Sequence, residues 1–146
     1  MIEGKGGYSP VKGRLFCGAV FVVVGVLVLC GLLFAQEEEF TILSILPPPD
    51  TLVPPVLTEI RIVFSREVVT REDVGVFRDF SFLPLSINPP LQGQFLWEDE
   101  KTLVLKPKGA LREATRYVFR FRDDFRDVRG KLLAGRHDFT LSTEPL

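Results

Sequence analysis

Three short runs between Gln94 and Arg122 alternate strictly between apolar and polar residues, and this pattern restricts the possible folds more than any other feature of the chain. A period of two residues is typical of a β-strand with one buried face and one exposed face. Glu98–Lys101 makes a polar connection of hairpin length between the first two runs, and Lys106–Gly109 ends the second run with turn-forming residues. The stretch therefore predicts an antiparallel sheet whose buried face carries Phe95, Trp97, Leu103, Leu105, Tyr117, Phe119 and Phe121.

Other short runs with strand character precede and follow this stretch. They span residues 40–46, 59–65, 79–87 and 137–143. Pro84 lies inside the third of these runs and lacks the N–H that a central strand needs, so an edge strand or a kinked strand is expected there. Residues 68–77 fit either a strand or a short helical turn. Together the runs predict an all-β fold, an antiparallel β-sandwich of about seven strands.

Leu15–Ala35 is a run of 21 residues without a charged side chain. As a helix it would be about 31 Å long, close to the roughly 30 Å of a bilayer's hydrocarbon core. The run also lacks the polar stripe of a helix on a soluble domain. We therefore expect it to enter a lipid bilayer. Lys12 and Arg14 directly precede it and favour a cytoplasmic N-terminus with export of the rest of the chain.

The fate of this apolar segment stays open between two alternatives. An uncleaved anchor is favoured because secretory signals have shorter apolar cores, and because Leu33 is not the small residue that cleavage after Ala35 would require. A cleaved signal is the other alternative, while lipid attachment at Cys30 is disfavoured by the bulk of Leu29. The predicted organisation is a cytoplasmic tail at 1–14, a transmembrane signal-anchor helix at 15–35, a juxtamembrane linker at 36–39 and a β-sandwich domain at 40–146 in the periplasm or at the cell exterior.

The charge distribution gives no support for nucleic-acid binding. The formal net charge of the chain is −1. Residues 106–136 carry a basic excess, but Arg116, Arg120 and Arg122 fall on the exposed side of a predicted strand, where charged residues are ordinary. We therefore expect a protein partner, or further domains of a longer chain, and no nucleic-acid partner.

The side chains that carry metal or nucleophilic chemistry are scarce. Cys17 and Cys30 both lie in the apolar run, and His137 is the single histidine, at the start of a predicted strand on the surface. With no second histidine and no cysteine nearby, His137 has no partners for a metal site. We expect no bound cofactor.

Two groups of carboxylates resemble functional sites and have simpler explanations. Asp123, Asp124 and Asp127 with Gly130 suggest a calcium loop but lack the ligand order of an EF-hand, so a solvated turn is expected. Glu98–Glu100 contains carboxylates that could perform acid–base chemistry, but it lies between two predicted strands and fits a hairpin tip. We therefore predict no catalytic, cofactor-binding or metal-binding residues, no small-molecule substrate and no enzymatic activity.

The aromatic residues divide into a regular and an irregular group. Trp97 alternates with Phe95, so core packing is expected for both. The phenylalanines of the less regular stretches would form an apolar patch for a partner if several of them were exposed. They are Phe77, Phe80, Phe82 and Phe125.

Several segments together resemble the bacterial Ig-like domain of surface proteins, over Phe40–Thr143. They are the IxIxFS run within Ile60–Val68, Gly93-x-x-x-Trp97, KTLVLKP at Lys101–Pro107, LREATRY at Leu111–Tyr117, the Asp-Val-x-Gly turn at Asp127–Gly130, and FTLST at Phe139–Thr143. More narrowly, the glycine–tryptophan spacing and the ATRY segment resemble the first domain of bacterial alpha-2-macroglobulins, which are membrane-anchored periplasmic protease traps. The resemblance implies an Ig-like sandwich in which Ile60, Ile62 and Phe64 fill the core, and in which the hydroxyl of Tyr117 bonds a nearby backbone group.

The chemistry of a protease trap is not carried over to any residue of this chain. A trap of this family needs a bait region and usually a Cys–Gln thioester far downstream, whereas Cys17 and Cys30 lie in the apolar run. The sequence therefore predicts a membrane-anchored extracytoplasmic structural or interaction domain, either the head of a longer protease inhibitor or a small protein that uses the domain alone. The alternative is a stand-alone cell-surface or adhesion-type binding module.

Overall fold

The computed structural model describes residues 37–146, of which Glu38–Leu146 form one compact unit. The predicted tail 1–14, the predicted transmembrane helix 15–35 and the first residue of the predicted linker lie outside the described residues. Within residues 37–146, no helix has the length and apolar character that crossing a membrane requires. Membrane insertion at Leu15–Ala35 therefore stays a prediction from the sequence.

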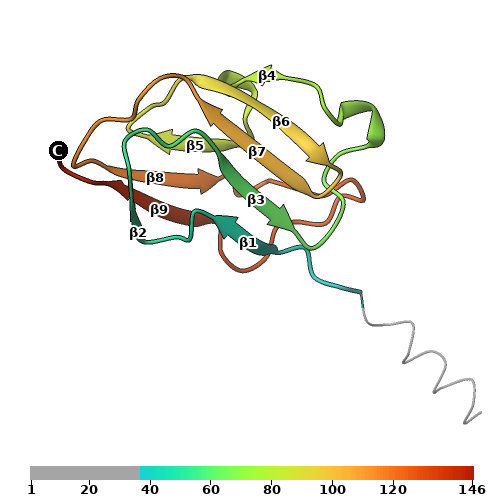
Figure 1. Cartoon of the computed structure of the whole chain (residues 1–146). Coiled ribbons are helices and arrows are strands. Elements are labelled where there is room, and N and C mark those ends of the chain that lie inside the picture. Colours follow the sequence, from blue (N-terminus) through green and yellow to red (C-terminus); the bar gives the residue numbers. More distant parts are fainter. Residues whose placement is uncertain (1–36) are drawn as a thin grey trace, which may run out of the picture. The chain divides into compact units, whose positions relative to one another are not determined.

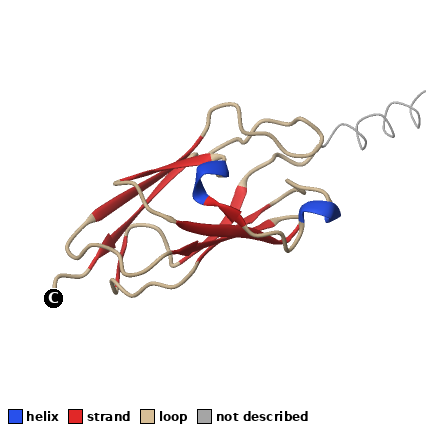
Figure 2. Ribbon diagram, turned by 90° about the horizontal axis from the view of Figure 1, so that it is seen from above, coloured by secondary structure: helices blue, strands red, loops and turns tan. Residues whose placement is uncertain are grey.

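Two β-sheets pack face to face in the compact unit (Figures 1 and 2). The five-stranded sheet has the order β1-β3-β7-β6-β4, and the four-stranded sheet has the order β2-β9-β8-β5. The strands are β1 Ile42–Leu46, β2 Thr51–Val53, β3 Ile60–Phe64, β4 Arg78–Asp79, β5 Leu85–Asn88, β6 Gly93–Asp99, β7 Thr102–Pro107, β8 Arg116–Phe121 and β9 Asp138–Thr143. The predicted β-sandwich is confirmed, and the order of the main strands is that of an Ig-like domain.

The prediction of about seven antiparallel strands is wrong in two details. The described residues contain nine strands, because β2 and the two-residue β4 are added to the predicted set. β2 also runs parallel to β9, so the sandwich is not purely antiparallel. The sequence conceals β2 because prolines stand on both sides of it, at 47–49 and at 54–55, and prolines do not pair inside a sheet.

Two open expectations for the middle of the chain are now decided. Residues 68–77 contain a single helical turn, Arg71–Asp73 (η1), rather than a strand. A second such turn, Phe80–Phe82 (η2), follows Asp79, whose carboxylate accepts a hydrogen bond from the Ser81 N–H at 2.9 Å. β5 begins directly after Pro84 and lies at the edge of the four-stranded sheet, which confirms the predicted edge strand.

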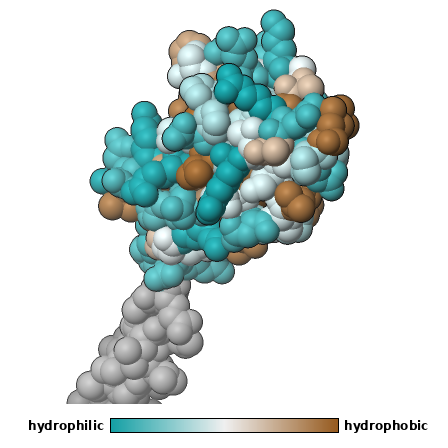
Figure 3. All heavy atoms as spheres, turned by 90° about the vertical axis from the view of Figure 1, so that its left-hand side faces the viewer, coloured by the Kyte–Doolittle hydropathy of each residue, from teal (hydrophilic) through white to brown (hydrophobic). Residues whose placement is uncertain are grey.

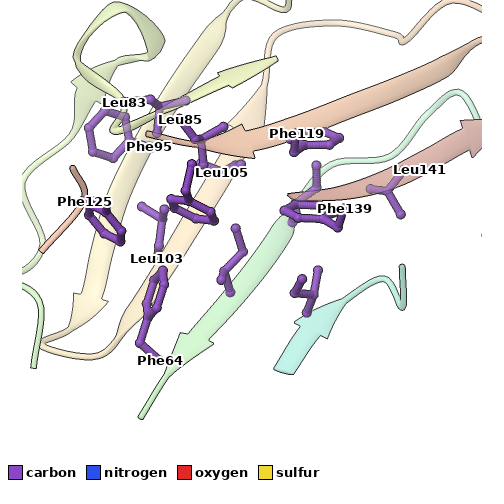
Figure 4. Close-up of a cluster of buried hydrophobic side chains, with 14 of the residues drawn as sticks. Phe64, Leu83, Leu85, Phe95, Leu103, Leu105, Phe119, Phe125, Phe139 and Leu141 are labelled. Atoms are coloured by element: carbon purple, nitrogen blue, oxygen red, sulfur yellow. The ribbon is translucent and has the colours of Figure 1, made fainter. Parts of the chain in front are cut away.

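The core lies between the inner faces of the two sheets, where side chains from both sheets point toward one another (Figure 4). Phe64 is fully buried, and its ring centre lies 5.5 Å from that of Phe40, 6.0 Å from that of Trp97 and 5.5 Å from that of Phe121. Aromatic pairs at such distances add to the stabilisation from buried area. The residues predicted for the buried face from the alternating runs are all at most 6% exposed, which confirms that prediction: Phe95, Trp97, Leu103, Leu105, Tyr117, Phe119 and Phe121.

Val104 departs from the simple alternation, since it lies on the outer face of β7 and is only 3% exposed. Its neighbours in the register are Arg61 on β3 and Leu96 on β6. Arg61 forms an ion pair with Glu98 of β6, and β7 is the strand between them. The arginine side chain therefore crosses β7 and covers Val104, which explains why a central strand is buried on both faces.

The N-terminal segment runs beside the last strand in the same direction. The N–H of Ala134 donates to Phe40 O at 2.8 Å, the N–H of Asp50 donates to Thr140 O at 2.8 Å, and Val53 pairs with Thr143. The compact unit therefore begins and ends at opposite ends of the sandwich, as Figure 1 shows for β1 and the C-terminus. We name these ends the N-terminal pole, where Phe40 lies, and the C-terminal pole, where β9 ends.

Candidate functional site

Asp127 lies at the N-terminal pole, and its side chain is only 1% exposed. It begins a turn in which the N–H of Gly130 donates to the Asp127 carbonyl at 3.0 Å. Its Oδ1 accepts from the N–H of Arg129 at 2.9 Å and from the N–H of Lys131 at 2.8 Å. Its Oδ2 lies 2.7 Å from Nε of Arg66, which forms a buried ion pair with it. The carboxylate thus joins its own loop to the residues that follow β3.

The same groups hold the first residues of the compact unit. Glu38 O accepts from Nη1 of Arg66 at 2.8 Å and from Nζ of Lys131 at 3.3 Å. Ser65 Oγ donates to Glu39 O at 2.8 Å and accepts from the N–H of Thr41 at 2.9 Å. The backbone is therefore fixed from Glu38 onward. We name this set the N-terminal network: Glu38, Glu39, Thr41, Ser65, Arg66, Asp127 and Lys131.

The electrostatics of the N-terminal network keep Asp127 ionised. Burial raises the pKa of Asp127, but the N–H groups of Lys131 and Arg129 and the guanidinium of Arg66 together lower it by more, so the pKa lies below its ordinary value. A buried carboxylate whose pKa is lowered stabilises the fold at neutral pH. Asp127 is therefore a structural charge, and the expected solvated turn is wrong for this residue, although the turn itself is confirmed.

The other two carboxylates of the suggested calcium loop do not join Asp127. Oδ1 of Asp123 lies 3.3 Å from Nη2 of Arg120, and Oδ1 of Asp124 lies 3.4 Å from Nε of Arg122. Both ion pairs are exposed on the surface. Among residues 37–146, no three His, Cys, Asp or Glu side chains come close enough together to hold a metal ion. The three aspartates therefore have three separate partners, and only Asp127 belongs to the N-terminal network.

A second set of polar contacts fixes the C-terminal pole. The N–H of Arg112 donates to the hydroxyl oxygen of Tyr117 at 3.0 Å, which confirms the predicted bond of this tyrosine to nearby backbone. Thr143 Oγ1 accepts from the N–H of Thr115 at 2.9 Å and donates to Arg112 O. We name these four residues, Arg112, Thr115, Tyr117 and Thr143, the C-terminal network. It ties the loop before β8 to the end of β9.

The sequence predicts a role in these networks for neither Thr143 nor Arg66. Thr143 is 2% exposed and lies on the same side of β9 as the buried Phe139 and Leu141, so the alternation placed it inward without revealing its partners. Arg66 directly follows the alternating run 59–65 and carries no pattern of its own. Only the fold brings each of them to its partner.

The carboxylates of Glu98–Glu100 lie at the tip of the β6–β7 hairpin, as expected. Asp99 Oδ1 accepts from the N–H of Lys101 at 2.8 Å, and its Oδ2 accepts from the hydroxyl of Thr102 at 3.0 Å. Glu98 pairs with Arg61, as described above. Glu100 forms an ion pair with Arg71, in which Oε1 of the glutamate lies 3.2 Å from Nε of the arginine. Each carboxylate thus has a different partner, and these contacts shape the hairpin.

His137 precedes β9 and is half-buried rather than fully at the surface. Its carbonyl accepts a hydrogen bond from the N–H of Phe121 at 2.8 Å. Its Nδ1 is buried and has no hydrogen-bond partner among the described residues. The backbone of His137 therefore joins β8 to the start of β9.

Of the irregular phenylalanines, Phe125 is buried, Phe80 is partly buried against the core, and Phe77 and Phe82 are exposed. Phe125 is 6% exposed and belongs to the core, as does Trp97, for which core packing was predicted. Phe77 is 55% exposed, with the Lys106 ammonium 5.8 Å from its ring centre, and Phe82 is 69% exposed. Figure 3 shows the side of the C-terminal pole, where apolar residues lie in several small separate groups among polar ones.

Two shallow grooves lie beside the segment that carries Phe77 and Phe82. The larger, of about 880 Å³, is lined by Phe80, Gly93 and Lys106 among others. A Cβ at position 93 would lie 2.3 Å from Lys106 O, so only glycine fits at the start of the Gly93-x-x-x-Trp97 motif. The smaller, of about 330 Å³, has Trp97 and Phe125 in its lining and arginine and aspartate side chains beside them.

Several solved structures resemble the chain at low identity. An L,D-transpeptidase in complex with imipenem has a TM-score of 0.46 and 15% identity over 73% of this chain and 41% of its own. An L,D-transpeptidase from Mycobacterium tuberculosis H37Rv has a TM-score of 0.45 and 16% identity over 74% of this chain and 42% of its own. The N-terminal part of the bacterial S-layer protein SbsC has a TM-score of 0.42 and 11% identity over 73% of this chain and 24% of its own. The chain thus spans less than half the length of each, and similarity at this level carries no information on activity.

The sequence itself gives a more direct assignment. No curated protein matches the chain. The family model described as bacterial Ig-like domain matches residues 36–143, which is most of the chain and the whole of the β-sandwich up to the end of β9. The chain therefore belongs to the bacterial Ig-like domain family.

Proposed function

We propose that this Ig-like domain is a structural and interaction module, without enzymatic activity, held on the outer side of the cytoplasmic membrane by Leu15–Ala35. The observation that carries the proposal is that the domain begins and ends at opposite poles, with the backbone fixed at each by a hydrogen-bond network. A domain of this form holds a protein partner, or further domains, at a set distance from its point of attachment. Glu38 follows Ala35 by three residues, which leaves a short connection.

The membrane part of this proposal is tested by topology and fractionation. A reporter enzyme that is active only outside the cytoplasm is fused after Leu146, and its activity is measured together with the membrane-bound fraction. We expect an active, membrane-bound fusion. Val24→Glu places a charge in the apolar run and should abolish membrane retention and export, whereas Val24→Leu should leave both unchanged. An inactive, cytoplasmic wild-type fusion would refute the proposal, and a lighter, soluble, exported product would identify a cleaved signal.

The narrower proposal is that the domain is the first domain of an alpha-2-macroglobulin-like protease inhibitor. It is supported by the Gly93-x-x-x-Trp97 spacing and by the ATRY segment at Ala114–Tyr117. An antibody against residues 36–146 would measure the mass of the native protein in membranes of the source cells. A membrane band far above 16.5 kDa supports the inhibitor, and a band near 16.5 kDa overturns it in favour of a small anchored module.

A second candidate function is that of a stand-alone cell-surface or adhesion-type binding module. The exposure of Phe77 and Phe82 favours it, because large exposed aromatic side chains are typical of binding surfaces. The double substitution of both phenylalanines by serine should reduce the adherence of cells that display the chain. Val128→Ser and Leu132→Ser, at exposed positions elsewhere, are the matched controls and should leave adherence unchanged.

A further inference from the structure

We infer that the domain is built to bear a mechanical load applied between its two ends. The inference rests on the fold of residues 38–146 and not on the proposed membrane anchoring. Three features of the described residues carry it: the parallel pairing of β2 with β9, the pairing of β1 with β3 in the other sheet, and the two polar networks.

The first feature is the direction of β2 and β9. A force that pulls the domain from its N-terminal and C-terminal ends draws β2 toward the N-terminal pole and β9 toward the C-terminal pole. Because the two strands are parallel, they must slide past each other along their length. The bonds at the two ends of this pair, from Asp50 N–H to Thr140 O at 2.8 Å and from Glu144 N–H to Val53 O at 3.0 Å, are then stretched together.

The second feature is the attachment of β1 to the other sheet. β1 pairs with β3 antiparallel from Ile42↔Phe64 to Leu46↔Arg61, with a shift of register between Ile42 and Ser44. A pull on the N-terminal end makes β1 slide along β3 as well. Phe40, just before β1, is fully buried, and its ring centre lies 5.6 Å from that of Phe125. The N-terminal segment is thus paired with both sheets, and it cannot leave one sheet without loading its pairing with the other.

The third feature is the position of the polar networks at the two points where force would enter. The N-terminal network fixes the backbone from Glu38, so the load passes to Arg66 and Asp127 before it reaches β1. The C-terminal network joins Thr143 to the loop before β8. Neither end can peel away residue by residue without first breaking these contacts.

Sliding and peeling demand different forces. A hydrogen bond is lost once donor and acceptor separate by roughly 1 Å beyond their ordinary distance of about 2.9 Å. When strands slide, all bonds between them reach this limit together, whereas in peeling they reach it one after another. The rate of forced unfolding is set by the unfolding barrier, so the direction of the pull should decide the force.

The test compares two pulling directions in one folded protein by single-molecule force spectroscopy. Residues 36–146 contain no cysteine and include the whole compact unit with its own core, so attachment cysteines are unique. In the first direction the handles are placed before Glu37 and after Leu146. In the second they are placed at Val56→Cys and after Leu146. Val56 is 71% exposed and lies in the turn after β2 at the C-terminal pole, so this pull peels β9 from its neighbours.

We expect a severalfold higher unfolding force in the first direction at the same loading rate. Glu144→Pro removes the N–H that bonds Val53 O and should lower the force in this direction, whereas Glu144→Ala keeps the N–H and should not. Equal forces in the two directions, or equal forces for the two Glu144 variants, would overturn the inference. A failed topology experiment would leave this result unaffected, so the two proposals fail separately.

Discussion

Polar side chains hold the backbone at both poles of the domain, but the two poles use different chemistry. At the N-terminal pole a buried ion pair between Arg66 and Asp127 holds the backbone of Glu38. At the C-terminal pole the neutral hydroxyls of Tyr117 and Thr143 hold the loop before β8. A buried charge that loses its partner costs more than a lost neutral hydrogen bond, and only a charge responds to pH. The N-terminal pole should therefore be the more sensitive of the two.

The largest difference between the poles is expected for Asp127→Ala. The substitution leaves the largely buried guanidinium of Arg66 without its carboxylate partner and removes the acceptor of the Arg129 and Lys131 N–H groups. Breaking a buried pair in this way costs about 3–5 kcal/mol in the free energy of unfolding. Urea unfolding of residues 36–146 measures it.

The control for this prediction is Asp123→Ala. The side chain of Asp123 is 84% exposed, and its ion pair with Arg120 lies at the surface, where such pairs contribute about 0–1 kcal/mol. If the two alanine variants lost the same free energy of unfolding, the N-terminal network would contribute no more to stability than an exposed ion pair does.

A smaller loss is expected for Thr143→Val at the C-terminal pole. Valine keeps the shape of threonine but leaves Thr115 N–H and Arg112 O without their side-chain partner in a buried site. The expected cost is about 1–3 kcal/mol in the free energy of unfolding, measured in the same way. Thr143→Ser retains the hydroxyl and should lose less, and the reverse order would show that packing of the methyl group dominates.

Tyr117→Phe should have a still smaller effect, about 0.5–1.5 kcal/mol, because it removes one neutral hydrogen bond and leaves the ring in the core. Tyr117 and Thr143 both bond the backbone of Arg112, so their substitutions should not be additive. A double-mutant cycle with Thr143→Val checks this coupling. Strict additivity would contradict a single C-terminal network.

The last difference is one of pH dependence. The folded-state pKa of Asp127 lies below its unfolded value, so its stabilisation is fully present above the unfolded pKa and is lost as the pH falls through the folded pKa. The free energy of unfolding should therefore fall more steeply below about pH 4 in the wild type than in Asp127→Asn. Thr143→Val should keep the wild-type slope. If the free energy of unfolding had the same pH dependence in the wild type and in Asp127→Asn, the proposed role of the Asp127 charge would be contradicted.

Local patterns in the sequence predict the sandwich well, and long-range partners account for what they miss. The alternation in 95–121 places its inner side chains correctly because period two follows from strand geometry alone. β2 is missed because three residues between prolines carry no period, and its pairing depends on β9 far along the chain. Val104 departs from the alternation for the same kind of reason, since Arg61 of another strand covers it.

The candidate sites show the same division. The bond of Tyr117 to Arg112 is local, and it could be predicted from the resemblance. The burial of Asp127 could not be predicted, because its turn is visible in the sequence but its partner Arg66 belongs to a distant strand end. The sequence can therefore show that a polar residue lies in a turn. Whether that residue is buried depends on the segments that the fold packs against it.

The strands at the edges of both sheets are short and lie next to prolines, and this affects how copies of the domain interact when they are crowded. The edge strands are β1 and β4 in one sheet and β2 and β5 in the other, and the last three have only two, three and four residues. Pro47 follows β1, Pro54 follows β2, and Pro84 and Pro89 enclose β5. Short edges interrupted by proline are poor templates for a strand of another molecule. We therefore expect neighbouring copies of this domain to resist pairing through their sheet edges.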